Sequence, residues 1–255
     1  MLLKGKNAVV FGAGGAMGGA VARAFAREGA HVFLAGRTLT RLEAVAEDIV
    51  GAGGSAGTAQ LDAHDPEAVE RYVATVEDTV AKKSGRIDVH FNAVGLNDVQ
   101  EVPLTGMPVE DFLRPVTEAA RTHFLTSTAV ARRMTAQGSG VIVLLSSTAA
   151  RESGYRMGGF SLACAAIECL GRTLAGEVGR QGVRVVTLRP NFTPDTHPEI
   201  AGEHPEALRP LIEGTALGRL PRMAEVADAA VFAASDRAGA MTGAVMNLSC
   251  GAIVD

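Results

Sequence analysis

Residues 9–18 are Val-Val-Phe-Gly-Ala-Gly-Gly-Ala-Met-Gly, and this stretch decides the fold. Its three apolar residues end a short strand-like segment, and a helical sequence opens at about Ala16. Glycines between a strand and a helix let backbone N–H groups approach a phosphate, which the helix N-terminus also attracts. A tight turn without a ligand is the alternative for this motif alone. The phosphate-binding interpretation assigns the role to Gly12, Gly14, Gly15, Ala16, Met17 and Gly18.

Short apolar runs alternate with longer amphipathic stretches along the rest of the chain, a pattern typical of βαβ units and a parallel sheet. The expected strands span residues 7–11, 31–35, 58–61, 87–91, 141–145, 183–188 and 244–248. The expected helices span residues 16–28, 39–50, 66–82, 109–137, 160–179 and 225–234. We expect Pro115 to interrupt the beginning of its helix, because proline cannot donate a hydrogen bond there. Residues 191–215, rich in proline, predict a loop with short helices over a pocket.

No repeat, low-complexity tract or linker divides the chain. The sequence therefore predicts one doubly wound α/β domain over residues 1–255, with a ligand crevice at the carboxyl ends of its parallel strands.

Composition excludes several classes of function. The formal charge of −4 comes without a basic stripe, which argues against nucleic acid as a partner. No apolar run approaches the roughly 20 residues that a membrane-spanning helix needs. The N-terminus lacks the organisation of a signal peptide, and the three cysteines form no metal-ligand pattern. We expect a cytoplasmic protein with reduced thiols, no metal and a small-molecule substrate.

Three further motifs each follow one of the expected strands. Asn92-Ala93-Val94-Gly95 follows the fourth expected strand, Ser146-Ser147 the fifth and Arg189-Pro190 the sixth. Together with the glycine turn, they make the chain resemble the short-chain dehydrogenase/reductase family nearly end to end. The resemblance implies a Rossmann-like sheet, a nicotinamide dinucleotide cofactor and a homo-oligomer, either a tetramer or a dimer.

The end of the second strand addresses the choice of dinucleotide. An enzyme that favours NAD normally carries an Asp or Glu here for the ribose 2′-hydroxyl. This chain has Gly36 and then Arg37, whose guanidinium suits a 2′-phosphate. NADP(H) is therefore favoured over NAD(H), with a solvated arginine at a strand end as the alternative.

The resemblance implies further cofactor contacts. Asp62 and Ala63 would lie beside the adenine, although Asp62 has a helix N-cap before Pro66 as an alternative role. Asn92 would tie the sheet together while the backbone after it lines the cofactor. The remaining implied contacts are Ala93, Val94, Gly95, Pro190, Asn191 and Thr193.

The catalytic half departs from the family pattern. The resemblance implies a Ser that polarises the substrate, a Tyr that donates a proton and a Lys that lowers the pKa of the Tyr. Ser147 stands at the Ser position, but Phe160 and Cys164 stand where Tyr and Lys would be. Ala119 stands at the position of a supporting Asn. Loss of positioned acid–base help costs about 10²–10⁴-fold in rate, so ordinary ketone reduction should be slow or absent.

Other groups are candidates for the missing proton donor. Tyr155 and His197 could edge the pocket, with packing or surface roles as the alternatives. Arg151, Glu152 and Arg156 share one loop and are expected at a solvated, charged edge. Cys164 would act as a nucleophile only beside a positive charge, and the sequence places none there, so a small buried thiol is expected.

Three functional hypotheses follow. The first is an NADP-dependent oxidoreductase that hands hydride to an activated carbonyl, imine or conjugated alkene. The second is a catalytically degenerate NADP-binding protein. The third is a non-redox isomerase, lyase or cyclase whose pocket the cofactor merely shapes.

Overall fold

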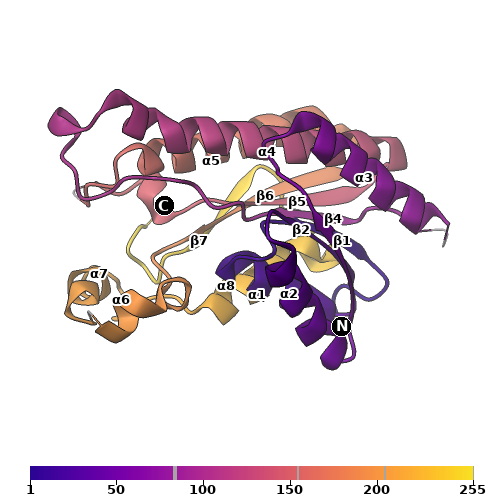
Figure 1. Ribbon diagram of the computed structural model, residues 1–255, viewed down its shortest axis with the longest axis horizontal. Helices are drawn as coiled ribbons and strands as arrows, with labels where there is room; N and C mark the ends of the chain where they lie inside the picture. Colours follow the sequence, from indigo (N-terminus) through magenta and orange to yellow (C-terminus); the bar gives the residue numbers. More distant parts are fainter. Residues whose placement is uncertain (83–84, 154, 204, 255) are drawn as a thin grey trace.

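A computed structural model describes residues 1–82, 85–153, 155–203 and 205–254. In these ranges the chain forms a parallel seven-stranded sheet in the order β3-β2-β1-β4-β5-β6-β7 (Figure 1). The strand order reverses between β1 and β4, and in such sheets ligands bind beyond the carboxyl ends of the strands at this point. The strands are β1 (Asn7–Phe11), β2 (His31–Gly36), β3 (Ser55–Gln60), β4 (Val89–Asn92), β5 (Gly140–Leu145), β6 (Val183–Pro190) and β7 (Ala244–Leu248).

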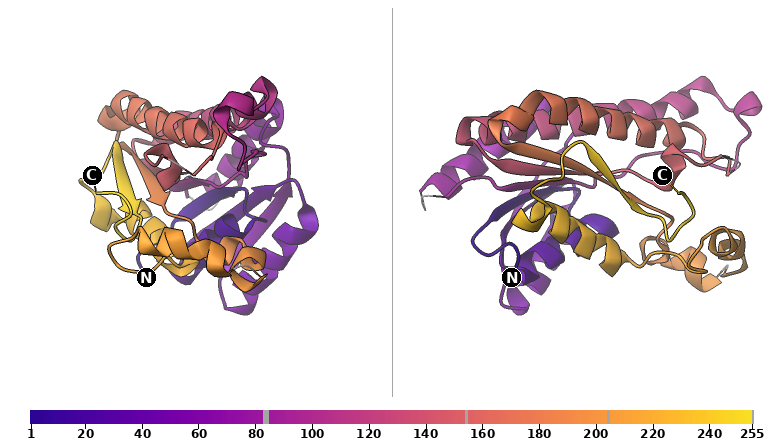
Figure 2. Two further views of the ribbon diagram at one scale, coloured as in Figure 1. Left: turned by 90° about the vertical axis from the view of Figure 1, so that its left-hand side faces the viewer. Right: turned by 180° about the vertical axis from the view of Figure 1, so that it is seen from behind.

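Helices cover both faces of the sheet. One face carries α3 (Pro66–Ala81), α4 (Val109–Gln137) and α5 (Gly159–Val178), and the other carries α1 (Ala16–Arg27), α2 (Leu39–Gly51) and α8 (Met223–Ala234) (Figures 1 and 2). The short helices α6 (Pro198–Glu203) and α7 (Arg209–Glu213) lie apart from these layers. Single 3₁₀ turns span 104–106, 148–150, 179–181, 194–196, 205–208 and 236–238.

Alternation along the strands builds a separate hydrophobic cluster on each side of the sheet. In β1, Ala8 and Val10 join the cluster with α1, α2 and α8, whereas Val9 and Phe11 join the one with α3, α4 and α5. Successive strand residues point to opposite faces, so a strand buried on both sides is apolar throughout. The sheet is thereby held rigidly between two layers.

The predicted α/β fold is confirmed, and the ends of the longer predicted elements differ from the observed ones by at most three residues. The prediction for Pro115 was wrong, because α4 runs through it without a break. Pro115 is buried, and its ring lies close to Gly159, where α5 packs tightly on α4. Packing of the two helices stabilises a position that costs only one backbone hydrogen bond.

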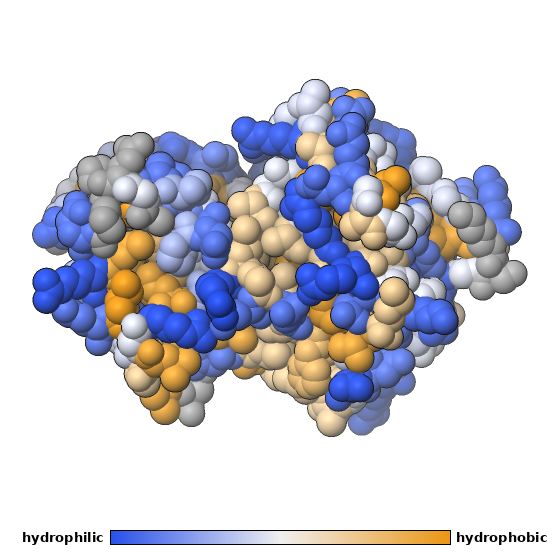
Figure 3. All heavy atoms as spheres, turned by 90° about the horizontal axis from the view of Figure 1, so that it is seen from below, coloured by the Kyte–Doolittle hydropathy of each residue, from blue (hydrophilic) through white to orange (hydrophobic). Residues whose placement is uncertain are grey.

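A lobe made of α6 and α7 projects beyond the carboxyl edge of the sheet (Figure 1, lower left). Hydrophobic side chains gather among hydrophilic ones on this lobe, at the left of Figure 3. The predicted loop with short helices over residues 191–215 corresponds to this part of the chain.

Across the described ranges, none of the helices combines the length and the apolar character that crossing a bilayer would require.

Candidate functional site

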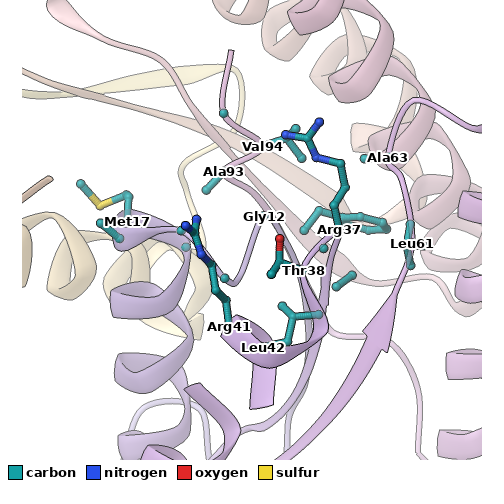
Figure 4. A pocket seen from close by; sticks show the side chains of 18 of the residues that line it. Gly12, Met17, Arg37, Thr38, Arg41, Leu42, Leu61, Ala63, Ala93 and Val94 are labelled. Carbon is teal, nitrogen blue, oxygen red and sulfur yellow. The ribbon is translucent and has the colours of Figure 1, made fainter. Parts of the chain in front are cut away.

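A cavity of about 370 Å³ opens at the carboxyl ends of β1, β2 and β4, beside the start of α1 (Figure 4). We call it the glycine-turn cavity. Most of the predicted cofactor residues line it, namely Gly12, Gly14, Gly15, Ala16, Met17, Gly18, Arg37, Asp62, Ala63, Ala93, Val94 and Gly95.

The glycine turn is built so that backbone, not side chains, faces this cavity. Gly12 has φ of 74°, and a Cβ there would overlap the carbonyl group of Ala93 on the neighbouring strand. A Cβ at Gly18 would overlap the carbonyl group of Gly12. The N-cap of α1 is Gly15, which offers no side-chain cap, so the N–H groups of the first turn remain available. These features fit a pyrophosphate at the helix N-terminus.

Two arginines enter the glycine-turn cavity. Arg37 follows β2, and Arg41 belongs to the first turn of α2, with the Thr38 hydroxyl between them (Figure 4). Within the part of the chain that the structure describes, neither guanidinium forms a salt bridge. The sequence analysis missed Arg41, although its spacing of four residues from Arg37 at a helix start was a usable signal.

Asp62 lies at the rim of the glycine-turn cavity as a carboxylate. Its Oδ1 accepts hydrogen bonds from the His64 backbone at 3.0 Å and pairs with His64 Nδ1 at 2.9 Å. The backbone hydrogen bond is the main cause that lowers the pKa of Asp62. The alternative role of helix N-cap belongs instead to Asp65, which accepts from two N–H groups of α3.

Asn92 stands behind the cavity rather than in it. Its side chain is fully buried, donates to Thr126 Oγ1 at 2.8 Å and accepts from the Val94 N–H at 2.9 Å. It therefore ties β4 to α4 and shapes the loop that lines the cavity.

A larger cavity of about 730 Å³ adjoins the first, because Met17 and Thr196 line both. We call it the Ser147 cavity. Pro190, Asn191 and Thr193, predicted as cofactor contacts, line this cavity and not the glycine-turn cavity. Ser147 and Phe160 also line it, and the α6–α7 lobe closes its far side with Ile200, Leu208 and Leu211.

Ser147 keeps a defined position at the end of β5. Its Oγ accepts from the Ala149 N–H at 3.3 Å and caps a 3₁₀ turn. Next to it, the Thr148 hydroxyl donates to Asn191 Oδ1 at 3.3 Å, which links the ends of β5 and β6. The cavity thus has hydroxyl groups on one wall and the Phe160 ring on another.

Cys164 lies one turn along α5 from Phe160 and is only 2% exposed. Burial, with a smaller contribution from Glu168, raises the pKa of the thiol to about 12. Glu168 itself is held by Arg189, at 2.7 and 2.9 Å, and by the Ser146 hydroxyl at 2.9 Å. The residue at position 164 is therefore a neutral buried thiol.

Of the three charged residues predicted at a solvated edge, Arg151 and Arg156 are exposed, whereas Glu152 lines the Ser147 cavity in a half-buried position. Burial raises the pKa of its carboxyl, while a hydrogen bond with the Thr148 side chain acts in the opposite direction. Tyr155 and His197 line the same cavity; His197 stacks on Phe192 at 5.6 Å, and its Nδ1 lies 3.2 Å from Glu199.

Comparison with known proteins gives consistent matches over the whole chain. A family model described as enoyl-(acyl carrier protein) reductase matches residues 12–252. The curated D-threitol dehydrogenase of Mycolicibacterium smegmatis is 32% identical over 244 residues, covering 95% of this chain and 90% of the relative.

Two solved structures also align with nearly the whole chain. A structure from Beutenbergia cavernae with bound NADP aligns with a TM-score of 0.83 and 30% identity, covering 96% of each chain. The structure of NAD⁺-bound xylitol dehydrogenase aligns with a TM-score of 0.86 and 26% identity, covering 97% of this chain and 99% of that one.

Proposed function

The chain belongs to the short-chain dehydrogenase/reductase family, and on this premise we propose that it is an NADP-binding oxidoreductase with an atypical active site. Its substrate would be an activated carbonyl, imine or conjugated alkene. The observation that supports the proposal is the pair of adjoining cavities: one is suited to a dinucleotide, and the other has Phe160 in its wall, where the resemblance to the family would place a Tyr.

The glycine-turn cavity would hold the dinucleotide through this chain's own backbone and charges. The N–H groups of the first turn of α1 would hold the pyrophosphate, and Arg37 with Arg41 would hold the 2′-phosphate. Asp62 and Ala63 would lie beside the adenine, while Pro190, Asn191 and Thr193 would border the nicotinamide end. When bound, NADPH supplies a hydride.

In the Ser147 cavity, the side chains at positions 160 and 164 cannot do acid–base work. Phe160 has no ionisable proton, and Cys164 is buried with a strongly raised pKa. The Ser147 hydroxyl would hydrogen-bond the substrate without acting as a strong acid. An acceptor that is already electron-poor needs less help, which supports the choice of activated substrates.

We also propose a homo-oligomer, a tetramer or a dimer, in the cytoplasm. Apolar side chains on α4 and α5 support the assembly: Phe124 is 56% exposed and Leu162 is 45% exposed. Light scattering on the purified protein should give a mass above that of one chain.

Calorimetric titration with NADPH and NADH, followed by a panel of ketones, enones and iminium ions, tests the function. We expect NADPH to bind and its absorbance to fall only with activated acceptors. Absence of binding by either dinucleotide would contradict the proposal. Binding without turnover across the panel would instead indicate an NADP-binding protein without redox activity, and product without redox change an isomerase, lyase or cyclase.

A further inference from the structure

We propose that the acceptor is a cation, an iminium ion with an apolar body, an inference that rests on the proposed oxidoreductase function. Three observations lead to it: the acidic side chains of the Ser147 cavity, the apolar surface of its walls, and the neutral residues at positions 160 and 164.

Three acidic side chains line the Ser147 cavity, those of Asp98, Glu101 and Glu152. Its described lining contains no lysine or arginine and one histidine, His197, whose Nδ1 lies 3.2 Å from Glu199. In the ranges that the structure covers, none of these three carboxylates is part of a salt bridge. Asp98 accepts from Gln100 Nε2 at 2.5 Å, which is a neutral donor.

In the protein without a ligand, ionisation of the half-buried Glu152 carboxyl is unfavourable. Burial disfavours the ionised form of Glu152 and raises the pKa of its carboxyl. A half-buried carboxylate without a countercharge is stabilised when a ligand brings a positive charge into the same cavity. An anionic substrate would meet like charges there, so carboxylate- or phosphate-bearing acceptors are disfavoured.

The rest of the wall suits the organic part of such a cation. Leu145, Met157, Leu208 and Leu211 give the cavity an apolar surface. Phe160 adds an aromatic ring, and aromatic faces attract cations by about 0.5–2 kcal/mol. A phenyl ring at position 160 is useless as an acid but useful beside an iminium nitrogen.

The chemistry explains why no acid is needed. With one hydride supplied by a bound reduced dinucleotide, a C–H bond would form at the iminium carbon and the C=N π electrons would move to nitrogen. The acceptor would become a neutral amine and the dinucleotide would be oxidised, so charge would balance without transfer of a proton. A lysine at position 164 would add a positive charge near the substrate, whereas the neutral Cys164 thiol adds none.

Binding to the NADPH-saturated protein tests the proposal without relying on turnover. The probes are the unreactive N,N-dimethyl-tetrahydroisoquinolinium cation and dimethyltetralin, its neutral isostere with carbon in place of nitrogen. We expect calorimetry to find the cation bound at least about tenfold more tightly, because an ion pair at low effective dielectric contributes at least this much.

Variants locate the effect. Glu152→Gln should weaken binding of the cation about tenfold and leave that of dimethyltetralin unchanged. The matched control is Glu177→Gln, an exposed carboxyl on α5, which should change neither. Asp98→Asn offers a second variant if thermal unfolding shows that Glu152→Gln is not folded. Equal affinity for the two probes, or an unchanged affinity for the cation in both cavity variants, would overturn the proposal.

Turnover measurements distinguish failure of the cationic-substrate inference from failure of the proposed oxidoreductase function. The N-methyl-dihydroisoquinolinium ion should consume NADPH, and a neutral enone of similar size should be slower. If the enone is reduced and the iminium ion is not, the oxidoreductase function stands and the cationic substrate is wrong. If NADPH itself does not bind, the proposed function fails first.

Discussion

The two adjoining cavities differ in what their function depends on. The glycine-turn cavity presents backbone N–H groups and two arginines, and its shape depends on Gly12 and Gly18, where an added Cβ would overlap backbone carbonyl groups. The Ser147 cavity depends on individual side chains, and it presents carboxylates and a phenyl ring. On the proposed function, dinucleotide binding depends mainly on backbone geometry, whereas acid–base chemistry depends on the side chains at positions 160 and 164. The two properties can therefore be changed separately by substitution.

The largest expected effect comes from placing a Tyr and a Lys at positions 160 and 164, where the resemblance to the family would place them. Phe160→Tyr combined with Cys164→Lys should raise ketone reduction by about 10²-fold or more, because it supplies a positioned acid and a cation that lowers its pKa. Steady-state consumption of NADPH with a simple ketone measures this. Adding Ala119→Asn gives a second variant with one more family residue.

The control for the restored pair is the single variant Phe160→Tyr, which should gain little because the phenol pKa stays near 10 without the lysine. If the double and triple variants bind NADPH, remain folded and still leave ketones untouched, positions 160 and 164 are not where the chemistry was lost. The contrast between the two cavities would then need another explanation.

The next largest effect is expected from a substitution in the glycine-turn cavity. Gly12→Ala should weaken NADPH binding by about a hundredfold, because it adds strain at positive φ and a Cβ that collides with the Ala93 carbonyl. Gly176→Ala is a matched control on α5, where nothing lies within 4 Å of the added Cβ. Calorimetry that finds unchanged affinity for Gly12→Ala would remove the turn from the binding site.

A third prediction concerns the core beneath both cavities. His90 on β4 and His123 on α4 are buried, and both ring nitrogens of His90 lack a hydrogen-bond partner in the described structure. Burial lowers the pKa of His90 to about 3 and that of His123 to about 4. The unfolded chain binds more protons than the folded one below about pH 6.5, so stability falls as pH decreases from there towards 4.

Urea unfolding measures this loss. At about pH 5 each histidine should cost about 2 kcal/mol relative to neutral pH. The variant His90→Leu with His123→Leu should lose most of this pH dependence. If the free energy of unfolding of that variant falls equally steeply with decreasing pH, groups other than these two histidines cause the acid sensitivity. The result also separates loss of binding from loss of fold when either cavity is studied at low pH.

Local sequence was sufficient where one residue type is required by backbone geometry. The glycine turn and the apolar strands follow from short-range patterns, and the structure places them as expected. The structural role of Asn92 was implied by the resemblance to the family, and the side chain is buried as that role requires. The N-cap of α3 was harder, because Asp62 and Asp65 both precede Pro66 and only the observed backbone assigns the cap.

The charge of the Ser147 cavity was beyond prediction from sequence. Nothing in a charged loop indicates which of its side chains faces a cavity, so Glu152 was expected in solvent. The burial of His90 on β4 and His123 on α4 was likewise not predicted, because no local pattern shows that a polar side chain lies in the core. Pro115 shows the same limit, because packing of α5 on α4 outweighs the local preference against proline.

The smallest expected effect refines the glycine-turn cavity. Arg37→Ala should weaken NADPH about tenfold and NADH less than about twofold, because only NADPH offers a 2′-phosphate for a charge-assisted hydrogen bond. Arg41→Ala should act in the same direction, since its guanidinium enters the cavity from the other side of Thr38 (Figure 4). Arg180→Ala, at an exposed turn after α5, is the control and should change neither affinity. Equal losses for the two dinucleotides would mean that Arg37 serves the pyrophosphate or the fold, and the preference for NADPH would have to come from elsewhere in the cavity.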